Sequence, residues 1–450
     1  MIPVLTPAEM AEVDAAAPEP VPVLIERAGA AVAAEALRLL EGGYGRRVVV
    51  LAGRGNNGAD GRAAAARLRR RGVRVEVVEA AGAPPTLPPA DLVIDAAYGT
   101  GFRGEHHAPD TGGAPVLAVD IPSGIHGLTG QEHGRAWTAV RTVTFAALKP
   151  GLLFPPGRER AGAISLADIG LDVSGATAGV VEDTDVAGWV PPRSAVEHKW
   201  EAALLVVAGS PGMTGAAHLC AAGAQRAGAG MVRVATPGMG DDPGRPVEAV
   251  GLPLPAEGWA PTVSEAAARY GAVVLGPGLG RADGTAAEVA RLLAALSQPV
   301  VVDGDGLAAL GTAAAEVLAD RPGPTVLTPH DGEHRLLTGA PPAADRMAAA
   351  RELAASTEAV VLLKGPTTVV AGPDGRAAVV LGDPRLATAG TGDVLSGVIG
   401  ALLARGTAPF EAAAAGAWLH ARAAELGPAA GLVAGDLPEL VGRARAEVGR

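Results

Sequence analysis

Short runs of β-branched and aliphatic residues alternate with Ala-rich stretches of helical periodicity along the first part of the chain. The apolar runs lie within residues 47–53, 73–80, 91–101, 115–124 and 140–148, and a helix is predicted over residues 57–71. Such alternation is typical of a parallel sheet with covering helices. A capping box over residues 6–9, with a proline at the first helical position, predicts a helix ahead of the sheet. A second helix is predicted over residues 23–40.

The alternation stops and then resumes further along the chain. Residues 182–199 show no sustained periodicity and contain Pro191 and Pro192, so we expect domains at residues 1–188 and 189–450. Further strands are predicted within residues 203–210, 230–237, 271–280, 298–307, 323–333, 359–370 and 377–383, with helices over 215–227, 391–404 and 409–426. No internal repeat relates the two halves. The predicted fold class is therefore α/β twice, in two different arrangements.

Composition narrows the functional classes. The 450 residues are 48% hydrophobic and 3% aromatic, which predicts folded cores of Ala, Val, Leu and Ile. A net charge of -11, with no basic run longer than Arg69–Arg71, argues against a nucleic-acid partner. No signal peptide or membrane-spanning stretch is evident, so we expect a cytoplasmic enzyme, and a homo-oligomer. The single cysteine, Cys220, is expected to be a buried hydrophobe.

Two residue types are rare enough to be informative. Lysine occurs only at Lys149, Lys199 and Lys364, and asparagine only at Asn56 and Asn57. In a chain so rich in arginine, the remaining lysines are candidates for positions that need a compact ammonium group. All three lie beside glycine-rich or histidine-containing turns. We therefore favour a functional role for these lysines over their having survived by chance.

The first glycine-rich loop has two interpretations. Gly53–Gly58 has the spacing G-x-G-x-x-G between a strand and a helix, and Glu79 stands where a ribose-binding acid would lie, which is typical of a nicotinamide-binding Rossmann domain. However, Asn56, Asn57 and Asp60 add oxygen atoms that a plain dinucleotide fingerprint does not need. A carboxylate beside a pyrophosphate is repulsive unless a cation intervenes. Hard oxygen ligands suit an alkali or alkaline-earth ion.

Two further acids follow later strands of the first half. Asp95 and Asp120 stand at the predicted carboxyl ends of strands, where open α/β sheets place their sites. Each could instead cap a helix or a turn. For Asp120 the capping interpretation is weaker, because Pro122 and Gly124 fix a tight turn that aims the neighbouring side chains.

The motifs GRGNNGADG, IDAAYGTGFRGE, VDIPSGI and FAALKPGLL follow LIERAGAAV in this order. Together they resemble the NAD(P)H-hydrate epimerase domain over residues 1–185. The resemblance implies that Asn57, Asp95 and Ser123 hold a potassium ion, and that Lys149 lies in the matching lysine-containing turn. It further implies that the hydrated dinucleotide contacts Asn56, Asn57, Gly58, Ala59, Asp60, Gly99, Thr100, Gly101, Phe102, Arg103, Gly104, Glu105 and Asp120.

The implied reaction interconverts the two C6 epimers of a hydrated nicotinamide ring. The hydroxyl must leave and return, or the ring must open, and a positioned acid or base must transfer a proton. We expect Asp120 to be that catalytic residue.

The second glycine-rich loop, Gly390–Asp393, leads into a predicted helix. Glycines let a phosphate approach the backbone, the helix N-terminus supplies N–H donors, and Asp393 can accept a proton from a hydroxyl that attacks phosphorus. The alternative is that Asp393 only caps the helix. Lys364 beside a glycine turn adds a second phosphate-binding signal. No Walker A motif is present.

Residues 191–450 resemble the ADP-dependent NAD(P)H-hydrate dehydratase domain, whose fold is similar to ribokinase. The matching motifs include LGPGLG, TPHDGE, LLKGPTT and LATAGTGDVLSG. The resemblance implies that the adenine nucleotide contacts Lys364, Gly365, Pro366, Thr367, Thr368 and Gly392, and that the hydrate contacts Ala216, Gly278, His330 and Asp393. In the implied reaction, ADP phosphorylates the C6 hydroxyl and elimination of phosphate restores the nicotinamide. Magnesium would screen the phosphates.

Two other hypotheses are carried forward. The second half could be a ribokinase-like small-molecule kinase for a vitamin precursor, with an auxiliary first half. This explains the G-T-G-D loop but not the motifs of the first half. Alternatively, the first half could be a non-catalytic sensing or scaffold module. The presence of Asn57, Asp95, Asp120 and Ser123 together argues against that.

Overall fold

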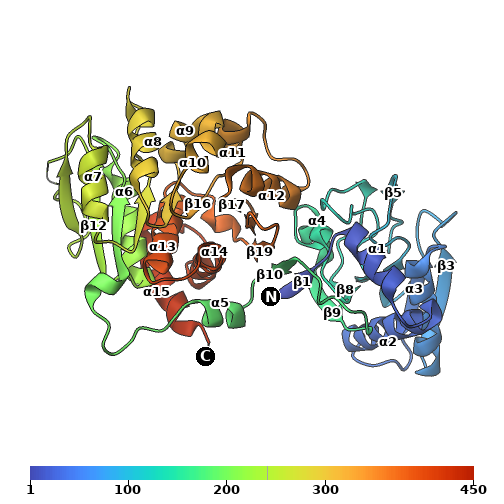
Figure 1. Cartoon of the computed structure of the whole chain (residues 1–450). Coiled ribbons are helices and arrows are strands. Elements are labelled where there is room, and N and C mark those ends of the chain that lie inside the picture. The colour runs from blue at the N-terminus through green and yellow to red at the C-terminus, as the bar shows by residue number, and fades with distance from the viewer. Residues whose placement is uncertain (241, 450) are drawn as a thin grey trace. The chain divides into compact units, whose positions relative to one another are not determined.

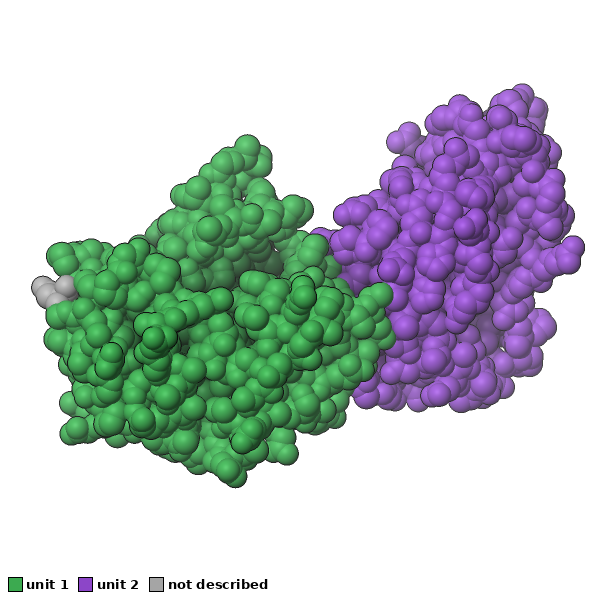
Figure 2. Space-filling view, turned by 90° about the horizontal axis from the view of Figure 1, so that it is seen from above, with its two compact units in different colours: residues 1, 179–450 green, residues 2–178 purple. Residues whose placement is uncertain are grey.

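The computed structural model describes residues 1–240 and 242–449, which form two compact α/β units (Figures 1 and 2). One unit is Ile2–Ala178, and the other is Gly179–Arg450 together with Met1. The change between units precedes the predicted domain boundary at residues 188 and 189, because α5 (Asp183–Trp189) packs against α14 (Pro409–Leu426) of the second unit. The division of function at that boundary stays a prediction.

The N-terminal unit contains a six-stranded parallel sheet in the order β3-β2-β4-β6-β8-β9. Its strands are β2 (Arg47–Ala52), β3 (Arg74–Glu79), β4 (Leu92–Ala96), β6 (Val116–Val119), β8 (Arg141–Phe145) and β9 (Ala163–Ala167). Its other elements are β1 (Ile2–Val4), β5 (His106–His107), β7 (Gly134–Arg135), α1 (Pro7–Ala16), α2 (Val21–Leu39), α3 (Asn56–Arg70) and α4 (Gly157–Ala161). The predicted strands and helices are confirmed, including the capping box of α1.

Both faces of this sheet are buried. Along β2, Val48 and Val50 enter the core beneath α2 and α3, whereas Val49 and Leu51 enter a second cluster on the opposite face. This explains why the strand is a continuous apolar run rather than an alternating one. Helix α3 can lie close to β4 because Gly61 has no side chain. A Cβ at this position would come within 2.5 Å of the Ala96 side chain.

The sheet of the C-terminal unit runs in the order β19-β18-β17-β16-β15-β14-β11-β12-β13. Its strands are β11 (Ala203–Val207), β12 (Met231–Pro237), β13 (Val250–Leu254), β14 (Ala272–Leu275), β15 (Val300–Val302), β16 (Thr325–Leu327), β17 (Val360–Leu363), β18 (Thr367–Ala371) and β19 (Ala377–Leu381); β10 (Ala178–Val180) stands where the chain passes between units. The pairs from β13 to β17 are parallel, but β17, β18 and β19 are antiparallel to one another. Residues 359–370, predicted as one strand, therefore form two, because Gly365 and Pro366 make a turn between them.

Helices cover both faces of this sheet (Figure 1). One face is covered by α6 (Thr214–Ala227), α13 (Thr391–Ala404), α14 (Pro409–Leu426) and α15 (Leu437–Glu447), which share a core cluster. The remaining helices are α7 (Ala260–Ala267), α8 (Thr285–Ala295), α9 (Asp305–Leu310), α10 (Ala314–Ala319), α11 (Asp331–Thr338) and α12 (Arg346–Thr357). Short 3-10 helices occupy Pro150–Leu152, Lys199–Ala202, Gly311–Ala313, Pro384–Leu386 and Ala434–Asp436.

Close packing of α6 against α13 depends on small residues. A Cβ on Gly223 would come within 2.7 Å of the Val394 carbonyl oxygen, and one on Gly397 would overlap the carbonyl oxygen of Cys220. Cys220 is fully buried, and burial raises the pKa of its thiol well above the ordinary value. The expectation of a buried hydrophobe is confirmed. Within the described ranges, no helix is both long and apolar enough to span a membrane.

The loop between β2 and α3 yields a stability prediction. A Cβ on Gly58 would overlap the carbonyl oxygen of Gly53, whereas one on Gly55 would meet nothing within 4 Å. We expect Gly58→Ala to destabilise the N-terminal unit by about 2 kcal/mol or more, because a backbone must move. Gly55→Ala is the matched control. Thermal unfolding, with hydrogen exchange to locate the effect, measures both; equal stability of the two variants would contradict the packing described here.

Candidate active sites

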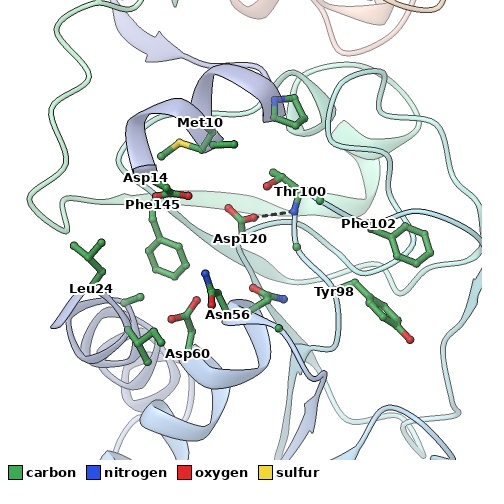
Figure 3. A pocket seen from close by; sticks show the side chains of 18 of the residues that line it. Met10, Asp14, Leu24, Asn56, Asp60, Tyr98, Thr100, Phe102, Asp120 and Phe145 are labelled. Atoms are coloured by element: carbon green, nitrogen blue, oxygen red, sulfur yellow. Dashed lines mark hydrogen bonds between the residues drawn. The ribbon is translucent and has the colours of Figure 1, made fainter. Parts of the chain in front are cut away.

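A cavity of about 610 Å³ opens in the N-terminal unit (Figure 3). Its walls come from α1, α2, the start of α3 and the loops after β4, β6 and β8. Among the predicted contact residues, the lining includes Asn56, Asn57, Asp60, Gly99, Thr100, Gly101, Phe102, Arg103 and Asp120. Gly58, Ala59, Gly104 and Glu105 do not line it. The structure thus brings together most of two loops that are far apart in sequence.

Asp120 is held rigidly at the cavity wall. Its backbone adopts a φ of 66°, which is uncommon for a residue other than glycine. Its carboxylate lies 2.8 Å from the Lys149 ammonium, accepts a hydrogen bond of 3.0 Å from the Thr100 amide, and accepts one of 3.3 Å from the Thr144 hydroxyl. Burial raises the pKa of Asp120, but Lys149 and these donors outweigh it and hold the pKa below its ordinary value.

Lys149 owes its position to this pairing. Its side chain is 2% exposed, and the ammonium also donates to the Thr144 hydroxyl and the Phe145 carbonyl, each at 2.9 Å. Among the described residues, the polar contacts of the ammonium are thus with two residues shortly before it in the chain and with the facing aspartate. Lys149 is therefore held in place as the ion-pair partner of Asp120.

Two further carboxylates project into the same cavity. Asp60 comes from α3 and Asp14 from α1 (Figure 3). Burial, reinforced by the charges of Asp120 and Asp14, raises the pKa of Asp60 to about 8. Burial also raises the pKa of Asp14, a residue that no sequence motif indicated.

Asp95 and Ser123 form a buried polar pair, and Asn57 lines the cavity. Asp95 is fully buried and accepts hydrogen bonds from the Ser123 amide at 2.8 Å and the Ser123 hydroxyl at 2.6 Å. Burial raises the pKa of Asp95 to about 6 in spite of these bonds. Both polar atoms of the Asn57 side chain are buried, and within the described chain they have no hydrogen-bond partner. Asn57 lies against Gly99, in the loop that follows Asp95.

Glu79 is not free to bind a ribose. Both of its carboxylate oxygens accept hydrogen bonds of 2.7 Å from Arg62 of α3, and Arg62 also donates to the Gly53 carbonyl at 2.8 Å. The acid instead ties α3 to the strand end. This geometry argues against the plain nicotinamide-cofactor interpretation of the loop.

In the C-terminal unit, Asp303 organises the carboxyl edge of the sheet. It follows β15, is 3% exposed, and accepts hydrogen bonds from the Lys364 ammonium at 2.8 Å and the Ser396 hydroxyl at 2.6 Å. Lys364 also lies 3.4 Å from Glu333. Burial acts to raise the pKa of Asp303, but Lys364 and the hydrogen bonds outweigh burial and hold the pKa below its ordinary value. Burial lowers the pKa of Lys364, but the two acids outweigh it and raise the pKa above its ordinary value.

Asp393 lies in the first turn of α13. The helix begins after Gly390, whose φ of 91° favours glycine. Burial and the charge of Asp303 raise the pKa of Asp393 to about 6, although Lys364 acts in the opposite direction. A Cβ on Gly392 would lie 3.5 Å from the Lys364 ammonium. The loop backbone and the lysine therefore meet at one place, as a phosphate site requires.

Two of the expected hydrate-contact residues are direct neighbours. Gly278 has a φ of 59°, and a Cβ there would come within 2.7 Å of the Ala216 side chain. His330 is the N-cap of α11: its Nδ1 accepts hydrogen bonds from the amides of Gly332 at 2.9 Å and Glu333 at 3.2 Å. Nδ1 of the imidazole thus has a structural role. The side chain is 58% exposed, so Nε2 is the ring nitrogen that could contact a substrate.

The expected nucleotide-contact segment follows Lys364. Thr367 is 1% exposed, so its side chain lies in the protein interior, whereas Gly365 and Thr368 are partly exposed. Arg346, which no sequence motif indicated, donates from Nη2 to the Lys364 carbonyl at 2.9 Å. It reaches this turn from the start of α12, the helix that directly precedes β17.

The comparisons with known proteins identify a family for each half of the chain. A family model described as NAD(P)H-hydrate dehydratase matches residues 204–445, and one described as YjeF-related protein N-terminus matches residues 21–88 and 79–151. The bifunctional NAD(P)H-hydrate repair enzyme Nnr of Salinibacter ruber is 38% identical, covering 94% of this chain and 92% of that protein. The enzyme of the same name from Moorella thermoacetica is 36% identical with the same coverage.

The chain belongs to the bifunctional NAD(P)H-hydrate repair enzymes. Among solved structures, an ADP/ATP-dependent NAD(P)H-hydrate dehydratase from Bacillus subtilis, co-crystallised with ATP and Mg²⁺, is 30% identical with a TM-score of 0.52, covering 60% of this chain and 98% of that chain. A ribokinase-like superfamily protein from Enterococcus faecalis, at 20% identity and a TM-score of 0.52, covers 60% of this chain and 96% of that chain and shows the fold. The predicted family and fold class are confirmed.

Some residues of this repair enzyme's sites were missed from the sequence. Asp303 carries the same signal as Asp95 and Asp120, an acid directly after a buried apolar strand, and could have been found. Asp14 carries no such signal, since it stands on an otherwise ordinary helix. Of the three lysines, Lys149 and Lys364 lie in the sites, whereas Lys199 is exposed and has no ion pair with any described residue.

The pairing of Asp120 with Lys149 predicts a stability change in the repair enzyme. We expect Lys149→Met to cost about 3 kcal/mol, because it leaves a buried carboxylate unpaired. The double variant Lys149→Met, Asp120→Asn should recover part of the loss. Lys199→Met, on an exposed lysine, is the control and should change stability by less than about 0.5 kcal/mol. Denaturant unfolding measures all three, and no recovery in the double variant would refute the pairing.

Proposed function

We propose that each unit of this repair enzyme carries one active site. The cavity of the N-terminal unit epimerises hydrated NADH and NADPH, and the carboxyl edge of the C-terminal sheet dehydrates the S form at the expense of ADP. The observation that carries this proposal is Asp393: a half-buried acid, with a pKa raised to about 6, at the head of a helix whose first turn meets Lys364.

In the dehydratase site, Asp393 acts as the general base. With a pKa near 6 it is ionised at neutral pH and still a competent proton acceptor. It removes the proton of the C6 hydroxyl, whose oxygen attacks the terminal phosphorus of ADP, and AMP leaves. Loss of phosphate from C6 and of a proton from C5 then restores NAD(P)H. Lys364 and the Gly392 amide hold the transferred phosphoryl group.

The substrates of this site are placed by residue type and position. We assign the adenine nucleotide to Lys364, Gly365, Pro366, Thr367, Thr368 and Gly392, with Thr367 acting through its backbone because its side chain is buried. We assign the hydrate to Ala216, Gly278, His330 and Asp393. Asp303, Glu333 and the phosphates gather negative charge at this edge, and magnesium would screen it when bound.

In the epimerase site, Asp120 is the catalytic carboxylate. It is ionised at neutral pH because Lys149 and Thr100 hold its pKa low despite burial. A fixed anion at the cavity wall suits a hydrated nicotinamide ring, which gains positive charge when its C6 hydroxyl departs. The two asparagines and the Gly99–Glu105 loop would contact the rest of the dinucleotide.

Asn57, Asp95 and Ser123 would hold a potassium ion. The fit rests on two observations: the side-chain oxygen of Asn57 is buried without a partner, and Asp95 is a fully buried carboxylate with no ion pair to any described residue. An uncompensated buried charge is costly, and oxygen donors suit an alkali cation. When bound, potassium would offset the charge of Asp95 and fix the loop that contains Gly99. A cytoplasmic location and a homo-oligomeric state remain predictions.

Asp393→Asn separates the two activities. With a mixture of both hydrate epimers, we expect ADP-dependent recovery of reduced-nicotinamide absorbance to fall by at least about 100-fold, while epimer exchange persists. Asp120→Asn should give the opposite result. For the unaltered protein, kcat/KM of dehydration should fall as pH drops below about 6, because the base must be ionised. Loss of both activities in Asp393→Asn would contradict independent sites.

Exchanging potassium for tetramethylammonium tests the cation site. We expect potassium to raise the melting temperature of the N-terminal unit and the rate of epimer exchange, with about 2.7 kcal/mol of stabilisation at one hundred times its dissociation constant. Asn57→Ala should abolish both responses. Dehydration of the S epimer provides the internal control. Equal responses of Asn57→Ala and the unaltered protein would rule out this site.

A further inference from the structure

The three carboxylates of the epimerase cavity are held in different ways. Asp120 is fixed by Lys149, Thr100 and Thr144, at distances of 2.8 to 3.3 Å. Asp60 has no hydrogen bond or ion pair through its carboxyl group to any described residue, although it is only 8% exposed and lines the cavity. A buried acid without a donor or cation is stable only when it carries its proton or when a ligand supplies a partner.

We propose that Asp60 is the residue that carries the exchanging proton in epimerisation, while Asp120 stays ionised throughout. This inference rests on the proposed epimerase role of the cavity and adds to it. Of the other two carboxylates in the cavity, Asp120 is kept ionised by Lys149, and Asp14, whose pKa is also raised, is exposed to solvent. The titratable and charged side chains that line it are Asp14 from α1, Arg54 after β2, Asp60 from α3, Tyr98 and Arg103 after β4, Asp120 after β6 and Lys149 after β8.

The electrostatics of the cavity agree with a protonated Asp60 and an ionised Asp120. Burial is the largest cause that raises the pKa of Asp60 to about 8, and the charges of Asp120 and then Asp14 add to it. Asp60 is therefore mostly protonated at pH 7, whereas Asp120 is not. Two acids whose environments separate their pKa values are the usual arrangement for an acid and an anion in one site.

The proton and the electrons balance without a co-reactant. Asp60 donates its proton to the C6 hydroxyl, the C6–O bond breaks, and water leaves while the lone pair of the ring nitrogen forms a C6=N bond. The positive charge on the ring faces the Asp120 carboxylate. Water then adds to the other face of C6, the C=N electrons return to nitrogen, and the Asp60 carboxylate takes the released proton. The acid is regenerated, and no redox change occurs.

Replacement of Asp60 tests the proposal directly. Epimer exchange is followed by separation of the two epimers with ADP omitted, so that dehydration does not interfere. We expect Asp60→Asn to lower kcat for exchange by at least about 100-fold with little change in KM, and Asp60→Glu to retain part of the activity. ADP-dependent use of the S epimer by the same chain should be unchanged. Exchange within threefold of the unaltered rate in Asp60→Asn would overturn the proposal.

The pH profile tests the same assignment through a neighbouring residue. Since the acid must be protonated, kcat/KM of exchange should fall as pH rises through about 8. Asp14→Asn removes one of the charges that raise the pKa of Asp60, so this alkaline limb should move to lower pH. Glu12→Gln, an exposed acid on the same helix, is the matched control and should leave the limb in place. Identical limbs in the two variants, or an unchanged limb in Asp60→Asn, would refute the assignment.

Stability supplies a readout that does not depend on activity. The pKa of Asp60 is about 8 in the folded protein and near 3.8 in the unfolded chain, so its contribution is complete below about pH 4 and is lost as pH rises through 8. The melting temperature of the N-terminal unit should therefore fall less between pH 5 and pH 9 in Asp60→Asn than in the unaltered protein. If the unaltered chain does not exchange epimers at all, the proposed function fails; if it does and Asp60→Asn matches it in rate and melting, only this inference fails.

Discussion

The close approach of helix backbone to neighbouring backbone, at a few glycines, is the constraint on which both sites depend. In the N-terminal unit, α3 can begin directly after β2 only because Gly58 places no side chain against the Gly53 carbonyl. In the C-terminal unit, Gly397 allows α13 to lie against the Cys220 carbonyl of α6. The first contact sets where α3 starts relative to its sheet, and the second sets how closely α13 packs against α6. The polar groups of the first turn thereby reach the carboxyl edge, where acids from other strands also end.

Two unrelated sheets arrive at the same arrangement of charge. In each, an acid directly after a strand pairs with a lysine at 2.8 Å, Asp120 with Lys149 and Asp303 with Lys364. Each pair is enclosed by protein and has a fixed geometry, which a compact ammonium permits and a broad guanidinium fork does not. This accounts for two lysines in a chain whose other basic residues are almost all arginine. The charges of these pairs have fixed positions and shift the pKa of the acids around them.

The sequence was sufficient for features that are local and insufficient for those that depend on packing. The strands and helices, and the motifs that contain Asn57, Asp120 and Asp393, are short local patterns, and local patterns can be found in the sequence. The apolar wall that α1 and α2 add to the epimerase cavity, and the entry of Asp14, arise only when distant segments pack together. His330 shows a second limit, because a motif drew attention to the residue but did not reveal that its Nδ1 caps a helix.

The two sites differ in the charges that surround one acid in each of them, Asp60 and Asp393. Neither carboxyl group forms an ion pair with a described residue. Burial raises the pKa of both Asp60 and Asp393, and nearby carboxylates add to the effect in each case. Only Asp393 has a lysine, Lys364, that partly opposes the rise, and its pKa stays near 6 whereas that of Asp60 reaches about 8. A group that must accept a proton at neutral pH needs the lower value, and one that must donate needs the higher. In the N-terminal cavity, Lys149 is bound tightly to Asp120, and this leaves Asp60 among negative charges and able to keep its proton.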